Sequence, residues 1–232
     1  MMFALRDAPS ITSTEQYTST VKSDKKEVRT INIRDLLENL FLSRSYWVLI
    51  IYNCLLGMTF WLIYTWLPTY FREQFNLSLG EAGISSTAFI QAASFAGVLI
   101  GGFWADRWSR RNIKGRLFVP VIGFTFGGPF LFIMASTGTF GIAIAGILIF
   151  GLAKGFHDSN HMPILCQVID ERYRATGYGI LGFFSIVAGG IMVYVGGAIR
   201  DANISLSVIF MISAVGVLIS GLILLIIRPK TE

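Results

Sequence analysis

The sequence predicts an all-α integral membrane protein with six transmembrane helices. Six long apolar stretches are separated by short polar loops, and the Lys and Arg residues are concentrated on alternate loops. Each stretch has the ~20 residues that an α-helix needs to cross a hydrocarbon core of ~30 Å. Because that layer holds no water, backbone N–H and C=O groups have to pair within the segment, which favours helices.

The six predicted spans follow one another with short connections. At the start of the second span, Ser78 and Glu81 have the spacing of a capping box, which marks the beginning of a helix. The spans are predicted at residues 46–71, 81–105, 117–135, 140–168, 173–199 and 205–227.

The composition agrees with this fold class. Apolar residues make up 53% of the chain and charged residues 14%. Many of the 24 glycines lie inside the apolar stretches, where they let helices approach closely. Cys54 and Cys166 lie within or at the edge of spans and lack the spacing of metal ligands. We therefore expect neither a metal nor a cofactor.

The distribution of basic residues predicts the orientation in the membrane. Of the 19 Lys and Arg residues, 16 lie on the N-terminal segment, the loops 106–116 and 170–174, and the C-terminus, whereas Arg72 and Arg200 lie on the opposite face. Loops rich in Lys and Arg stay in the cytoplasm, so we expect a multi-pass protein of the cell (inner or plasma) membrane with both termini cytoplasmic. The net charge of +5 follows from this topology, so the lipid bilayer is the expected partner and nucleic acid is not.

The chain is predicted to divide into a cytoplasmic segment at 1–45, a membrane domain at 46–228 and a short cytoplasmic tail at 229–232. Within the first segment, apolar residues of the range 31–44 recur at helical spacing while charged residues fill the other face. This pattern is typical of an amphipathic helix that lies at the membrane surface.

A charged motif closes the second span. It consists of Gly102, Asp106, Arg107, Arg110 and Arg111. We expect the glycine to let two helices approach, the aspartate to cap a neighbouring helix N-terminus, and the arginines to hold the aspartate or lipid phosphates. The alternative is a plain cluster of positive charge that stops translocation.

This motif, read as G-x-x-x-D-R-x-x-R-R, resembles the signature loop of the major facilitator superfamily, although Ser109 stands where the family usually has glycine. Residues 66–70 (WLPTY) are similar to the family's seventh helix, and residues 172–179 (RYRATGYG) to the loop that enters its eleventh. Residues 3–9 resemble the end of a sixth helix. Within the family, the branch of organic-anion symporters and spinster-like lipid carriers is the most similar.

The resemblance implies half of a 12-helix fold. Members of the family combine two six-helix halves, each made of two inverted three-helix repeats, and bind substrate near the midplane between the halves. This chain would supply helices seven to twelve, and Asp106 and its neighbours would form a cytoplasmic gating motif against the other half. A second six-helix half is therefore an expected partner, as a separate chain, a missing N-terminal half or a second copy.

The candidate binding site lies on the fourth span. Lys154, His157, Asp158 and His161 occur at i, i+3, i+4 and i+7, so they lie on one helix face, and Asn160 faces away. Lys or Asp at a helix centre costs about 2.5–3.5 kcal/mol in a membrane. Such a stripe has to face the bundle interior or a watery cavity. We expect Lys154 to attract an anionic substrate, and Asp158 or the histidines to carry a coupling proton.

Other interpretations of the stripe stay open. Lys154 and Asp158 have the spacing of an intrahelical ion pair with a structural role. The span is also ~43 Å long at 1.5 Å per residue, so Asp158 and His161 can lie near the cytoplasmic surface. A metal site at His157, Asp158 and His161 is disfavoured by the adjacent lysine.

Weaker candidates lie on the first two spans, where polar and aromatic residues serve more often for packing than for ligand contact. They are Asn53 and Tyr64, together with Tyr52, Trp61 and Thr65, on the first span, and Gln91 and Ser94 on the second.

The sequence thus predicts transport of a small solute, an organic anion or amphiphile, by alternating access with ion or proton coupling. A homodimerising six-helix membrane protein, or a transporter fragment without activity of its own, is the alternative. An enzyme is not expected, because the sequence contains no nucleotide-binding loop and no nucleophile–base pair.

Overall fold

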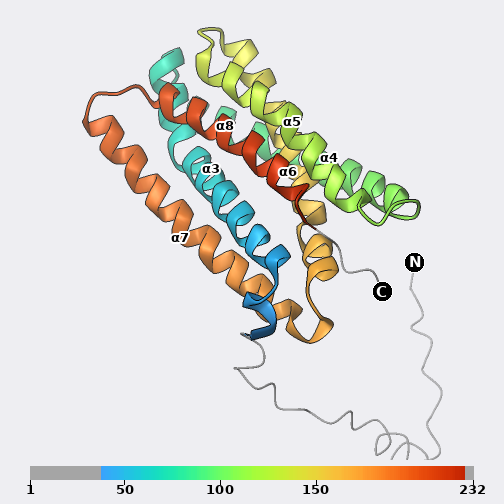
Figure 1. The fold of residues 1–232 in the computed structure, drawn as a ribbon. Coiled ribbons are helices and arrows are strands. Elements are labelled where there is room, and N and C mark those ends of the chain that lie inside the picture. The colour runs from blue at the N-terminus through green and yellow to red at the C-terminus, as the bar shows by residue number, and fades with distance from the viewer. Residues whose placement is uncertain (1–37, 228–232) are drawn as a thin grey trace, which may run out of the picture. The chain divides into compact units, whose positions relative to one another are not determined.

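The computed structural model describes residues 38–227, and this part of the chain contains helices and no strand. The fold class is confirmed, because six helices are long and apolar enough to cross a membrane (Figure 1). They are α3 (Arg44–Phe75), α4 (Leu79–Ser109), α5 (Gly115–Ser136), α6 (Phe140–Val168), α7 (Arg174–Asp201) and α8 (Leu206–Leu224), with a single 3₁₀ turn, η1 (Glu171–Tyr173), ahead of α7.

The helix ends follow the loop chemistry that the sequence contains. α3 ends at Phe75, and the next residue, Asn76, adopts the left-handed conformation that asparagine tolerates at a helix C-terminus. The predicted capping box is confirmed, since the Ser78 hydroxyl accepts from the Glu81 N–H and the Glu81 carboxylate accepts from the Ser78 N–H at 3.0 Å. α3 and α4 extend several residues beyond the predicted spans, because their polar ends continue the helix outside the apolar stretch.

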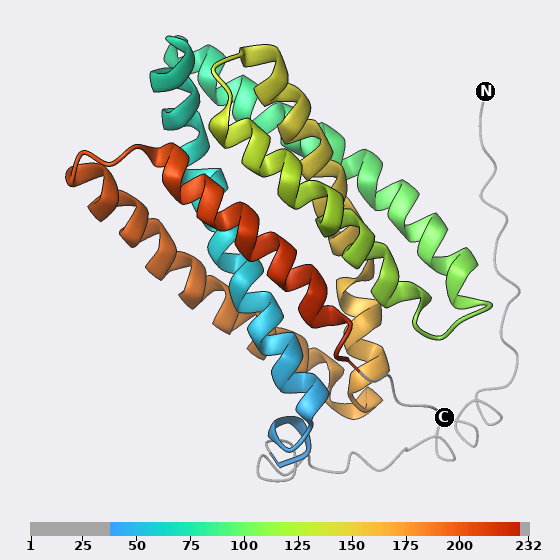
Figure 2. The ribbon, with the colours of Figure 1, turned by 45° about the horizontal axis from the view of Figure 1, so that its top comes forward.

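Two sets of neighbours organise the bundle. α6 packs between α4 and α5, while α3 packs against α7 and α8, and α5 joins the two sets through α8. α4 and α7 lie at opposite edges of the bundle (Figures 1 and 2). α6, which carries the predicted stripe, therefore lies inside the bundle and not at its edge.

Glycines bring α4 and α6 into backbone contact. A Cβ atom added to Gly155 would lie 2.6 Å from the Val98 nitrogen and 2.7 Å from the Gly97 carbonyl carbon. One added to Gly151 would lie 2.9 Å from the carbonyl oxygen of Ile90. Close approach through small residues is a main source of helix association in membranes. It places the middle of α6 directly beside α4.

The predicted amphipathic helix at 31–44 lies mostly outside the described residues. Residues 38–41 are helical, and the helix is interrupted at 42–43 before α3 begins. Leu40 is buried and approaches the first turn of α7, where its side chain would lie 3.6 Å from a Cβ atom at Gly177.

Candidate functional site

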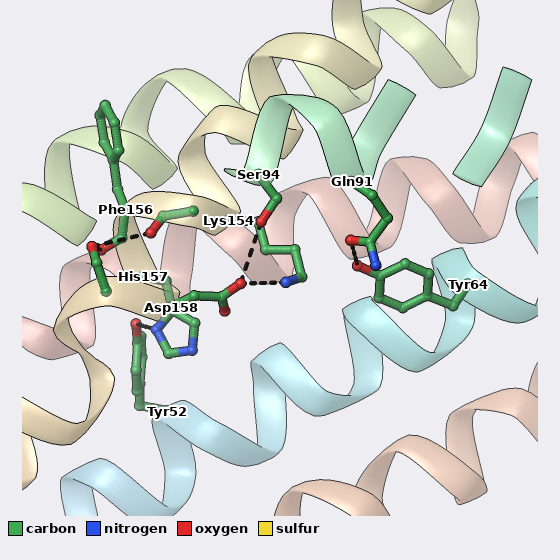
Figure 3. Close-up of polar contacts among 10 residues, drawn as sticks. Tyr52, Tyr64, Gln91, Ser94, Lys154, Phe156, His157 and Asp158 are labelled. Carbon is green, nitrogen blue, oxygen red and sulfur yellow. Dashed lines mark hydrogen bonds and ion pairs between the residues drawn. The ribbon is translucent and has the colours of Figure 1, made fainter. Parts of the chain in front are cut away.

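A single ion pair occupies the middle of α6 among the described residues of that helix. Lys154 lies 14 residues from each end of α6, and its ammonium group contacts the Oδ2 atom of Asp158 one turn later (Figure 3). The lysine side chain is 14% exposed and the aspartate side chain 34%. The intrahelical pair permitted by the spacing is therefore formed. At 1.5 Å per residue, Lys154 lies about 21 Å from either helix end and Asp158 about 15 Å from the C-terminal end.

Neighbouring helices complete this pair. The Ser94 hydroxyl of α4 donates to Asp158 Oδ2 at 3.3 Å (Figure 3). The ring of Phe60 on α3 lies beneath Lys154, with 5.6 Å between Nζ and the ring centroid, which is a cation–π distance. The carboxylate thus receives one charged and one neutral donor, and the ammonium has one carboxylate partner. Both groups retain partial exposure and can exchange these partners.

The two histidines form a separate cluster. His157 is buried, and its Nδ1 atom lies 2.6 Å from the Tyr52 hydroxyl of α3 (Figure 3). Its ring lies 5.8 Å from that of Phe124 and 4.9 Å from that of His161, which in turn lies 5.2 Å from the ring of Tyr178 on α7. The predicted stripe is therefore divided, because the ion pair bonds to α4 while the histidines pack among aromatic rings of α3, α5 and α7.

The burial of Asn160 is not predicted by the sequence pattern. It is fully buried and donates to the Phe156 carbonyl at 2.9 Å, while its Oδ1 atom has no hydrogen-bond partner among the described residues. The His161 Nε2 atom is also buried without such a partner. Spacing predicts that Asn160 leaves the stripe, but only the packing of the bundle determines that it is enclosed.

The weaker candidates have different surroundings. Tyr64 donates to Gln91 Oε1 at 3.2 Å, so these two residues link α3 and α4 near the ion pair (Figure 3). Asn53 is buried and donates to the Leu49 carbonyl of its own helix. The structure thus brings Tyr64 and Gln91 together, and it encloses Asn53 within the α3 packing.

The charged motif after α4 pairs differently from the expectation. Asp106 accepts from Arg116 at 2.6 Å, and not from Arg107, Arg110 or Arg111. The short loop folds the first turn of α5 back beside the last turn of α4, which brings Arg116 within reach. Of the two expected roles of the three following arginines, the structure therefore does not show the one in which they hold the aspartate, and their role toward lipid phosphates stays a prediction.

Within the described helices, Gly102 does not make the close approach that is expected of it. A Cβ atom added there would lie 3.8 Å from Ser159 Cβ, which is an ordinary contact. The preceding Gly101 makes the close approach, because a Cβ atom there would lie 2.9 Å from Phe156 Cα. Helix rotation places Gly101, and not Gly102, toward α6.

Metal ligands do not gather in the described part of the chain. No group of three or more His, Cys, Asp or Glu side chains there has a geometry that could hold a metal ion. His157 and Asp158 point toward different helices, which separates two of the three residues considered for such a site.

Known transporters resemble this chain in sequence. A Bacillus subtilis (strain 168) protein named Uncharacterized transporter YybO is 33% identical over 51% of this chain and 27% of its own length. A Cupriavidus necator protein named Probable sulfoacetate transporter SauU is 26% identical over 81% of this chain and 44% of its own length. This chain therefore spans less than half of the length of these relatives.

The fold has solved counterparts. A bacterial homolog of the human lysosomal transporter Spinster, crystallised in an inward-facing and unoccupied conformation, superposes with a TM-score of 0.65 at 15% identity, over 90% of this chain and 54% of that one. The sequence also matches the Major Facilitator Superfamily model over residues 3–160 and 49–232. Together with the six spanning helices and the motif after α4, these matches show that the chain belongs to the Major Facilitator Superfamily of membrane transporters.

Proposed function

We propose that this chain carries a small organic anion across the membrane together with a proton, by alternating access. The observation that carries the proposal is the partly exposed Lys154–Asp158 ion pair at the midpoint of α6. Substrate sites near the bilayer midplane are the rule in secondary transporters. An ionisable pair at that depth raises the free energy of inserting the helix, and such residues usually belong to a substrate or ion pathway.

The charge of the pair supports coupling between anion and proton. The empty site is neutral, because Lys154 and Asp158 compensate each other. A proton on Asp158 would release the ammonium group, which could then bind a carboxylate or sulfonate. A proton and a monovalent anion together leave the site neutral, whereas either one alone leaves an unpaired charge in a low-dielectric region. The site thus favours loading both or neither.

The names of several relatives support an anionic substrate. Besides the probable sulfoacetate transporter, an Escherichia coli protein named Probable L-galactonate transporter is 24% identical over 71% of this chain. A Planococcus maritimus Na(+), Li(+), K(+)/H(+) antiporter, 28% identical over 82% of this chain, favours a second candidate, in which Asp158 exchanges protons for metal cations. Lys154 already occupies that carboxylate, so we prefer the anion.

The proposal includes a companion six-helix unit. Symmetry of the family places the substrate between two halves, and this chain spans about half of the related proteins. We propose that a second copy or a separate half covers the α4 and α7 side of the bundle. We further propose that the N-terminal segment 1–45 and the tail 229–232 face the cytoplasm of a cell (inner or plasma) membrane, as the 16 basic residues on that side favour. The alternative is a homodimer or a fragment without transport activity.

Reconstitution of the chain in proteoliposomes tests these statements. Uptake of sulfoacetate and of a sugar acid is measured under an imposed proton gradient, and crosslinking before and after reconstitution reports assembly. We expect accumulation that requires the gradient. Lys154→Ala should abolish anion uptake, whereas Asp158→Asn should abolish gradient-driven accumulation but retain anion exchange, since its lysine stays free.

Two exposed loop residues provide matched controls. Lys114→Ala and Asp170→Asn make the same chemical changes outside the spans and should leave uptake unchanged. Normal accumulation by Lys154→Ala would reduce the pair to a structural role. Sodium-dependent proton release without anion uptake would favour the antiporter, and no flux from a crosslinked dimer would favour the alternative without transport.

A further inference from the structure

An open pocket of about 390 Å³ lies between the C-terminal ends of α3 and α7 and the beginning of α8. This end of the bundle is opposite the loop between α4 and α5 (Figure 1), and the proposed topology places it on the outer side of the membrane. We call it the outer pocket. Its polar lining includes Glu73 and Gln74 of α3, Arg200 of α7 and Asn203 of the following turn.

The walls of the outer pocket are held by contacts within this chain. The N–H of Asn203 donates to the Arg200 carbonyl at 2.9 Å, and Asn203 adopts a left-handed conformation (φ 58°) in the turn between α7 and α8. On α3, the Tyr70 hydroxyl donates to the Ala135 carbonyl of α5 at 3.2 Å, and the Tyr70 ring lies 5.2 Å from that of Phe210 on α8. The pocket is therefore formed by helices of this chain alone.

The two charged residues of the pocket are held unequally. Arg200 donates to the Glu73 carboxylate at 2.5 Å, and it also lies over the ring of Trp66, with 5.8 Å between Cζ and the ring centroid. Trp66 is fixed in turn by its bond to the Val193 carbonyl at 3.1 Å. Glu73 has Arg200 as its one ion-pair partner among the described residues, and its side chain is 52% exposed. Glu73 can therefore turn to water while Arg200 stays beside Trp66.

The pocket offers more hydrogen-bonding groups than Glu73 uses. A guanidinium group has five N–H donors, arranged in a fork that matches a carboxylate or sulfonate, and Glu73 accepts from one of them. The carboxamides of Gln74 and Asn203 line the same pocket, and their side chains make no hydrogen bond with other described residues. A carboxamide can both donate to a hydroxyl group and accept from one. The lining thus matches a carboxylate that carries hydroxyl groups.

We propose that the outer pocket binds a hydroxylated organic anion, such as a sugar acid, whose carboxylate replaces Glu73 on Arg200. A cation would have to displace Arg200 from Glu73, which the Trp66 ring opposes. The choice of a sugar acid rests on the proposed function, in which the transported solute is an organic anion. The outer pocket then receives this solute before the Lys154–Asp158 pair does, and its binding releases the link between α3 and α7.

Saturation-transfer NMR on the detergent-purified Lys154→Ala variant, titrated with gluconate, tests the proposal. This background removes the cation of the central site, so that the remaining binding reports the outer pocket. Added to it, Arg200→Gln should weaken gluconate binding at least about tenfold, because charge-assisted hydrogen bonds are lost. Glu73→Gln should strengthen binding about twofold to fivefold, because the anion no longer competes with an exposed ion pair.

Two neighbouring residues provide matched controls. Arg72→Gln and Asp201→Asn make the same changes in charge nearby, but these residues do not line the pocket and take part in no ion pair within the described chain. Each should change the affinity less than about twofold, because exposed charges are screened by salt. Propionate, which has the carboxylate but no hydroxyl group, should bind more weakly than gluconate.

A purely structural ion pair predicts a different result. Arg200→Gln and Glu73→Gln remove the same contact, so they would then shift the affinity in the same direction. That result, an equal effect of Arg72→Gln, equal affinity for propionate, or no gluconate binding by Lys154→Ala would overturn the outer pocket as an anion site.

Two further measurements keep this test independent of folding and of the proposed function. If Arg200→Gln does not fold, Arg200→Lys replaces it, and this variant should weaken binding while Arg72→Lys does not, because lysine lacks the paired donors. If the proposed function fails, wild-type proteoliposomes show no uptake while the outer pocket still binds gluconate.

Discussion

The α4–α6 contact and the α3–α7 contact are built from different parts of the chain. α4 and α6 meet through glycines, so that the backbone around Gly155 lies against the backbone around Gly97. α3 and α7 approach in this way only at Gly57 and Ser185 within the described residues. On the outer side of that point they meet through tryptophan rings, with Trp61 packed over the backbone of Gly189.

The ends of α3 and α7 are joined by side chains. At one end, the Tyr46 hydroxyl donates to the Gly177 carbonyl at 2.9 Å. Toward the other end, Trp66 donates to the Val193 carbonyl at 3.1 Å. Arg200 pairs with Glu73 at 2.5 Å, and the side chains of these two residues are 46% and 52% exposed.

This difference indicates which helices can move relative to the others. Backbone contact leaves no side chain to rotate, so α6 and the Lys154–Asp158 pair form a fixed platform beside α4. α7 contacts the other long helices little apart from α3, and its span is the least buried of the six described spans. Contacts through side chains and end-to-end bonds can be exchanged for others, so we expect α7 to move relative to α6 during a transport cycle.

The largest expected effect is at the backbone contact. Gly155→Ala should destabilise the bundle by about 1–3 kcal/mol, because its new methyl group overlaps backbone atoms of α4 that cannot rotate away. Gly182→Ala on α7 is the matched control, since no atom lies within 4 Å of a Cβ added there. Thermal unfolding in detergent should separate the two, and similar midpoints would contradict the backbone-contact model.

The same change at a side-chain contact should have a smaller effect. A Cβ atom at Gly196 would lie 2.7 Å from Trp66 Nε1, so the ring has to shift and its bond to Val193 weakens. We expect a loss of about 1 kcal/mol, the contribution of one hydrogen bond. If Gly196→Ala lost as much stability as Gly155→Ala in the same unfolding assay, the proposed difference between side-chain and backbone contacts would be contradicted.

Removal of the tyrosine hydroxyl tests the bond at the beginning of α7. Tyr46→Phe removes the side-chain donor to the Gly177 carbonyl in a buried region, so stability should fall by about 1 kcal/mol. Hydrogen exchange should increase in the first turns of α7 and stay unchanged in α6. Tyr194→Phe, at a side chain that is 78% exposed, is the control and should alter neither quantity.

The smallest effect is expected for the exposed Glu73–Arg200 ion pair, at the C-terminal end of α7. Glu73→Gln should change stability by at most about 1 kcal/mol, because exposed pairs are well solvated. Wild-type stability should fall slightly as salt is raised, and the variant should be insensitive. A larger loss would show that Arg200 holds α7 more firmly than its exposure implies. Glu171→Gln, which removes the exposed Glu171–Arg174 pair at the opposite end of α7, is the control and should change stability by no more than Glu73→Gln.

Much of the fold follows from the sequence alone: the membrane as surroundings, the six spanning helices of the described residues, and the position of the ion pair along α6. Stretches as long as the bilayer admit one backbone conformation, so the predicted span at 140–168 coincides with α6. Helical spacing was enough to place Lys154 beside Asp158. The charged motif pointed to the family without any structure.

Which groups meet across helices follows from the packing of the bundle and not from the sequence pattern. Whether Asp106 bonds to Arg107 or Arg116, and whether His157 follows the ion pair or joins Tyr52, depends on the rotation of each helix about its axis. Apart from the stripe on the fourth span, the apolar stretches of this chain show no clear polar face, so periodicity leaves most of that rotation undetermined. It is set by where glycines such as Gly97 and Gly155 allow two backbones to touch, which is a property of helix pairs and not of single segments.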